Sequence, residues 1–108
     1  MDLRKFPRIK AKIAAEVNNK QAMLENVSKN GIKMKMWSDD VPRGRNVEVT
    51  FRSGTHTINL KGEVRWCMRD KYSFQDLKEV GLYIEDAPQE YYQFIDSLST
   101  GKTAAARM

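Results

Sequence analysis

The chain has 108 residues and a formal net charge of +5, with 41% hydrophobic and 31% charged residues. This length favours one domain over residues 1–108, and the composition is that of a globular protein rather than a disordered or membrane-spanning chain. A single cysteine excludes an internal disulfide framework and indicates a reducing compartment, so we expect a cytoplasmic location. One cysteine and one histidine cannot fill a four-ligand thiol zinc site, and no metal site is expected. The basic start lacks the apolar region of a signal peptide, and no stretch reaches transmembrane length.

The positive charge is concentrated at the N-terminal end. Residues 1–12 carry five basic side chains and one acidic side chain, a local charge of +4, whereas the rest of the chain is close to neutral. We predict a flexible basic arm over residues 1–10. Such an arm can attract phosphate, nucleic acid or an anionic lipid surface; the alternative is a solvated tail that only aids solubility.

Residues 11–85 alternate between apolar and polar side chains, which is the pattern of half-buried strands. The alternating segments are residues 11–17, 22–27, 32–36, 47–51, 58–66 and 80–84. We expect Gly31 to use its freedom to adopt positive φ where the second segment ends. In the longest segment, we expect Val64 and Trp66 to share one face and Gly62 to mark a bulge. With a polar loop at 69–78, the pattern predicts an all-β fold, a small antiparallel barrel of six or seven strands.

One helix is predicted, over residues 86–99. Asp86 stands three residues before a glutamine, as in a capping box, and Pro88 suits a first helical turn. Gly101 is expected to stop the helix, leaving a tail at 100–108. Helical spacing gives a single apolar stripe made of Tyr91, Phe94, Ile95 and Leu98.

No arrangement of residues indicates catalysis. His56, the only histidine, has no nucleophile–acid pattern near it, and an exposed strand histidine is the ordinary interpretation. Cys67 is expected to lie near the barrel surface or core rather than to act as a reactive thiolate. We therefore expect no enzyme and no cofactor.

Two short segments are candidates for binding. In the arm, Arg4 and Arg8 flank Pro7, which restricts the backbone. Each guanidinium can then grip a phosphate, or the O6/N7 edge of a guanine. In the second segment, residues 26–31 (NVSKNG), an amide, a hydroxyl and a glycine gather at a strand end. Taken alone, this hexapeptide is also an ordinary polar turn.

Together these segments resemble the PilZ domain family, the bacterial receptors for cyclic di-GMP. Arg4 and Arg8 match the family's RxxxR motif. Asn26, Ser28 and Gly31 match its (D/N)xSxxG motif. Residues 62–66 (GEVRW) and 80–84 (VGLYI) look like two later strands of the family. The resemblance covers about residues 3–98 and implies a PilZ-type barrel followed by a helix.

The resemblance implies cyclic di-GMP as the ligand and assigns roles to the motif residues. Arg4 and Arg8 would hold phosphate and guanine edges. Asn26 and Ser28 would meet a guanine or the sugar–phosphate ring, and Gly31 would permit the turn.

Three further residues are auxiliary candidates: Leu3, Lys5 and Trp66. Leu3 stands where family members that bind a stacked ligand dimer often carry an extra arginine. Its identity favours one ligand per site, with Lys5 and Lys10 as partial substitutes for that arginine.

The expected function is a cyclic di-GMP receptor whose arm orders on binding and changes the surface offered to an unidentified protein effector. One alternative is a PilZ-like interaction module that binds no nucleotide. Another is a small barrel that binds RNA or single-stranded DNA, with stacking aromatics such as Trp37, Tyr72 and Phe74. The near-neutral barrel makes nucleic acid the less favoured partner.

Overall fold

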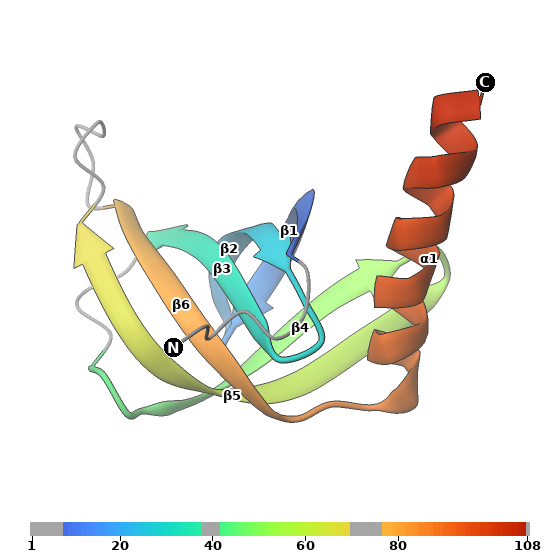
Figure 1. Ribbon diagram of the computed structural model, residues 1–108. Helices are drawn as coiled ribbons and strands as arrows, with labels where there is room; N and C mark the ends of the chain where they lie inside the picture. The colour runs from blue at the N-terminus through green and yellow to red at the C-terminus, as the bar shows by residue number, and fades with distance from the viewer. Residues whose placement is uncertain (1–7, 38–41, 70–76, 108) are drawn as a thin grey trace, which may run out of the picture.

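The computed structural model describes residues 8–37, 42–69 and 77–107, with side chains described as far as residue 98. Within these residues the chain forms six strands and one helix (Figure 1). They are β1 (Ile9–Val17), β2 (Lys20–Val27), β3 (Gly31–Trp37), β4 (Asn46–Ser53), β5 (His56–Arg69), β6 (Leu77–Asp86) and α1 (Gln89–Arg107). The predicted all-β barrel with a C-terminal helix is confirmed.

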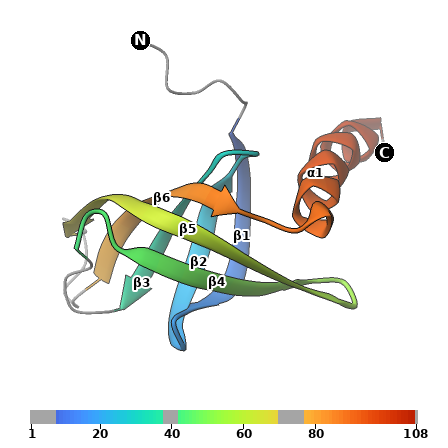
Figure 2. The same ribbon diagram turned by 90° about the horizontal axis from the view of Figure 1, so that it is seen from below.

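The strands close into a barrel in the order β1-β2-β3-β6-β5-β4, and every neighbouring pair is antiparallel. Four of the six pairs join strands that are consecutive in the sequence, and the other two are β3 with β6 and β1 with β4. Closure comes from a short pairing of β1 with β4, from Ala15↔Phe51 to Val17↔Val49 (Figure 2). The face that carries the β3–β6–β5 strands is the one that matters for the site.

The apolar positions of each strand point into the barrel, as the alternation predicts. Leu24, Met34, Val49, Val64 and Val80 are fully buried, and they come from five different strands. A barrel of this size is filled by its own side chains and leaves no channel. Ligands therefore have to bind on its outside.

Helix α1 lies at the side of the barrel where the β4–β5 hairpin ends (Figures 1 and 2). Three residues of its predicted apolar stripe are buried, with Tyr91 at 0% exposure, and the fourth, Leu98, is partly buried. The ring of Phe51 on β4 lies 6.4 Å from that of Tyr91 and 5.2 Å from that of Phe94. These edge and tilted contacts fix the helix to the barrel wall.

Most strands are longer than predicted, and the predicted polar loop at 69–78 loses Arg69 to β5 and residues 77–78 to β6. Three further differences concern the arm and the two ends of the helix. β1 begins at Ile9, so residues 9 and 10 of the predicted arm belong to the barrel. Asp86 ends β6 instead of capping the helix, which begins at Gln89. The helix also continues beyond residue 99, through Gly101 to Arg107, because a run of alanines follows the glycine and alanine has the highest helix propensity.

The long strand β5 carries two irregularities in its pairing with β6. The first lies beside Gly62, where a bulge was predicted, but its extra residue is Glu85 of β6, because Lys61 pairs with Asp86 and Gly62 with Ile84. The second lies between Val64 and Trp66, and it contradicts the prediction that these two residues share a face. Val64 is fully buried, whereas Arg65 and Trp66 both line an outer pocket. The extra residue of a bulge shifts the side-chain alternation, so two consecutive side chains reach the same surface.

Candidate functional site

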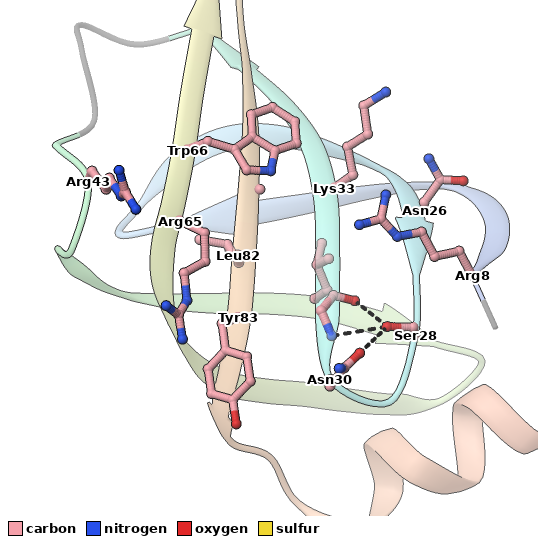
Figure 3. Close-up of a pocket in the computed structure, with 13 residues that line it drawn as sticks. Arg8, Asn26, Ser28, Asn30, Lys33, Arg43, Arg65, Trp66, Leu82 and Tyr83 are labelled. Atoms are coloured by element: carbon pink, nitrogen blue, oxygen red, sulfur yellow. Dashed lines mark hydrogen bonds between the residues drawn. The ribbon is translucent and has the colours of Figure 1, made fainter. Parts of the chain in front are cut away.

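A pocket of about 510 Å³ lies on the outer face of the barrel (Figure 3). Five residues singled out from the sequence line it: Arg8, Asn26, Ser28, Gly31 and Trp66. The three other candidates of the arm, Leu3, Arg4 and Lys5, lie outside the described residues. Segments that are far apart in the sequence thus meet at one surface.

Strand register explains why they meet. Asn26 on β2 pairs with Lys33 on β3, and Lys33 pairs with Gly81 on β6. Gly81 in turn pairs with Trp66 on β5, and on the other side Asn26 pairs with Lys10 of β1. These five residues form one row across five strands, and the row crosses the floor of the pocket.

The loop between β2 and β3 is held by the hydroxyl of Ser28. This side chain is only 3% exposed. Its Oγ accepts a hydrogen bond from the Gly31 N–H at 3.1 Å and lies 2.9 Å from Asn30 Oδ1 and 3.2 Å from the Gly31 carbonyl oxygen. The single hydroxyl proton can be donated to either of these two acceptors. Ser28 therefore closes the loop from inside and shapes the pocket wall.

Helix α1 holds the same loop from behind. The buried Tyr91 hydroxyl donates a hydrogen bond of 2.6 Å to the Ser28 carbonyl. Burial raises the pKa of Tyr91 well above its usual range, so the phenol stays protonated and remains a donor. An exposed ion pair at 3.9 Å between Lys29 and Asp96 adds little to this attachment. The C-terminal helix is thus joined directly to the loop between β2 and β3.

Gly31 serves the site through its size rather than through an unusual φ. The described glycines with positive φ are Gly44 and Gly54, so the expectation of positive φ at Gly31 is wrong. A β-carbon at Gly31 would lie 3.1 Å from the carbonyl oxygen of Leu82 on β6. The motif glycine lets β3 approach β6 closely at the mouth of the pocket.

Gly81 has a similar role on the other wall. A β-carbon at this position would overlap the indole of Trp66, with the Cζ2 atom only 2.8 Å away. The indole therefore lies over the backbone of β6, in the space that the missing side chain leaves. This places a half-buried aromatic ring beside Lys33 on the pocket floor (Figure 3).

Arg65 is oriented by two neighbours. Its guanidinium lies 4.8 Å from the centre of the Tyr83 ring, a cation–π geometry, and its Nε lies 3.3 Å from a carboxylate oxygen of Glu63. Figure 3 shows Arg65, Tyr83 and Trp66 on the side of the pocket opposite Arg8. Two arginines thus line the pocket from opposite sides.

The electrostatics of the pocket favour an anion. Of the described lining residues, Arg8, Lys33, Arg43 and Arg65 are cationic and none is acidic. Trp66 and Tyr83 add ring surfaces, and Asn26 and Asn30 add amides that both donate and accept hydrogen bonds. Cations, rings and amides together suit a phosphate-bearing ligand with planar bases. No group of three or more metal-binding side chains occurs in the described part of the chain.

Sequence reasoning missed several lining residues, and the reasons differ. The apolar alternation already placed Arg65 on the outer side of its strand, but nothing in the sequence showed that a pocket lies there. Lys33 was placed on the outer side of its strand, but nothing in the sequence showed that this side was a pocket floor. Arg43 comes from a segment that composition identifies only as a loop. Such neighbours depend on register, which a single sequence does not show.

Comparison with known proteins identifies the fold and the family. The family model of the PilZ domain matches residues 2–99, and no match was found among curated proteins. One similar solved structure is the Bacillus subtilis inhibitor of motility (MotI/DgrA), with a TM-score of 0.77 and 15% identity. The alignment covers 96% of this chain and 53% of that one, so this chain spans about half the length of that protein. In the described residues, no helix combines the length and apolar character needed to cross a bilayer. The chain belongs to the PilZ domain family.

Proposed function

We propose that this protein is a receptor for cyclic di-GMP, the ligand associated with its family. The observation that carries the proposal is the convergence of Arg8, Asn26 and the Ser28 loop on one cationic pocket. A volume of about 510 Å³ is within the usual range of small-molecule sites, about 300–1,000 Å³. The residues supply binding groups, and we propose no reaction.

The proposed roles follow from where the side chains lie. Arg8 grips a phosphate or the O6/N7 edge of a guanine, and Asn26 contacts a base or the sugar–phosphate ring. Trp66 offers its ring for stacking. Ser28 and Gly31 act mainly by shaping the loop, because the Ser28 hydroxyl already serves partners within that loop.

The proposed output of the receptor is a change in the surface that it offers to a partner protein. Arg4 and the other basic side chains of residues 1–7 bind the ligand, and the arm orders on binding. The ordered arm then changes the surface that a protein effector contacts. The proposed location is the cytoplasm, in keeping with the unpaired thiol of Cys67. The effector is a protein of unknown identity, and nucleic acid is not the proposed partner.

The proposal is tested by calorimetric titration with cyclic di-GMP, with GTP and cyclic GMP as controls. We expect saturable binding of cyclic di-GMP alone. Arg8→Ala should weaken it by about tenfold to a hundredfold, because a bidentate guanine contact is worth about 1–3 kcal/mol. Arg52→Ala is the matched control, since Arg52 is an exposed arginine of β4 that does not line the pocket.

Three results would contradict the proposal in different ways. If the titration shows no heat of binding at several temperatures, the remaining interpretation is an interaction module that binds no nucleotide. Equal losses for Arg8→Ala and Arg52→Ala would mean that general charge explains the binding. Tight binding of single-stranded nucleic acid with a steep salt dependence would favour the nucleic-acid alternative.

A further inference from the structure

Lys33 occupies a central position that neither binding motif includes. It lies in the middle of the row across the pocket floor, between Asn26 and the Gly81–Trp66 pair. It also lines a second, adjoining hollow of about 370 Å³, together with Lys10 and Lys12. Figure 3 shows its side chain between Trp66 on one side and Arg8 with Asn26 on the other. An anion in the pocket would meet its ammonium group.

Two carboxylates hold this ammonium group. Lys33 Nζ lies 3.5 Å from a carboxylate oxygen of Glu79 on β6 and 4.0 Å from one of Glu25 on β2. Glu25 is shared with Lys35, whose Nζ lies 3.4 Å from its other oxygen. Two lysines and two glutamates therefore form a chain of ion pairs along the outer face of the barrel.

These ion pairs are weak enough to be exchanged. All three distances exceed the usual range for a charge-assisted hydrogen bond, about 2.7–2.9 Å. The side chains keep between 23% and 31% of their exposure, so solvent screens the pairs. A phosphate that reaches hydrogen-bonding distance of the ammonium group would interact with it more strongly than either glutamate does.

We propose that Lys33 is a further ligand-binding residue, and that Glu25 and Glu79 compete with the ligand phosphate for it. The inference rests on the proposed function, since it concerns the same pocket. It adds a ligand contact outside both motifs. It also makes affinity depend on two carboxylates that do not line the main pocket.

The first test replaces two lysines separately and measures cyclic di-GMP binding by calorimetry at fixed ionic strength. Lys33→Met should weaken binding by about tenfold, as expected for the loss of one charge-assisted hydrogen bond. Lys61→Met is the matched control, because it removes an exposed strand lysine that does not line the pocket and does not pair with Glu25 or Glu79 in these contacts. Its affinity should stay within about twofold of the unaltered protein. Lys33→Gln repeats the test if the methionine variant folds poorly.

The second test moves affinity in the opposite direction. Glu79→Gln removes one competitor for Lys33 and should tighten binding by about threefold. Glu48→Gln makes the same charge change at the far end of the barrel, away from the pocket, and should leave affinity unchanged.

The outcomes separate this inference from the proposed function. If the unaltered protein binds and Arg8→Ala weakens binding, but Lys33→Met does not, only the inference on Lys33 is overturned. Equal effects of Lys33→Met and Lys61→Met, or weaker binding by Glu79→Gln, would overturn it as well. If the unaltered protein binds no cyclic di-GMP, both proposals fail.

Discussion

Strand β2 has a polar turn at each end, and the two turns have become different structures. Residues 18–19 (NN) join it to β1, and residues 28–30 (SKN) join it to β3. Both consist of the residue types that favour turns. The first is a tight hairpin connection in which Asn18 and Asn19 have φ values of 49° and 70°. The second has no positive φ and is closed by a buried hydroxyl.

The surroundings of the two turns also differ in charge. The hollow beside the first turn is lined by Glu16 and Glu48, and none of its described lining residues is cationic. The second turn forms one wall of a pocket with four cations. An anion is repelled at one end of β2 and attracted at the other. Turn composition alone therefore does not produce a cationic pocket; the strands and the helix packed around the turn do.

Among substitutions that separate the two turns, the largest effect is expected from Tyr91→Phe, which alters the contact of α1 with the β2–β3 turn. The substitution removes the donor to the Ser28 carbonyl and leaves a buried acceptor without that hydrogen bond. It should lower the free energy of unfolding by about 2 kcal/mol, as measured by urea denaturation. Tyr92→Phe, at the partly exposed neighbour, should change it by less than about 0.5 kcal/mol. Equal effects would mean that α1 does not hold the loop.

A smaller effect is expected from Gly81→Ala, which alters the opposite wall of the pocket. The added β-carbon would overlap the Trp66 indole and push the ring away from β6. We expect about tenfold weaker cyclic di-GMP binding through the lost stacking surface, together with a changed tryptophan emission. Gly54→Ala, at a hairpin tip with positive φ, should lower stability and leave affinity unchanged. Unaltered affinity in Gly81→Ala would exclude Trp66 from the site.

The smallest effect is expected at the other turn. Asn18→Ala removes the side-chain acceptor of the Glu48 N–H, a bond of 3.0 Å, and places alanine at positive φ. The free energy of unfolding should fall by about 1 kcal/mol, as measured by thermal or urea denaturation. Affinity for cyclic di-GMP should not change. A loss of affinity comparable to that of Arg8→Ala would show that the two turns are not independent.

The alternation of the strands, the apolar stripe of α1 and the two motifs could be predicted from the sequence, because all of these are local patterns. The orientation of Trp66 could not be predicted, because it depends on a bulge at Arg65 that the apolar alternation does not indicate. Nor did it indicate that Tyr91 reaches back to Ser28, a hydrogen bond between residues 63 positions apart. Gly31 shows the same limit, since its contact with Leu82 depends on strand pairing. Contacts between distant segments can be predicted only when the register of the strands is known.

The most direct test is to record the ¹H–¹⁵N correlation spectrum of the protein during titration with cyclic di-GMP. We predict the largest shifts at the backbone amides of residues 26–33 and Gly81 and at the Trp66 indole N–H, with Asn18 and Asn19 unchanged. Shifts centred on the Asn18–Asn19 turn, or spread evenly over exposed cationic residues, would contradict binding at this pocket. A spectrum that does not change at saturating ligand would show that the pocket is not a cyclic di-GMP site.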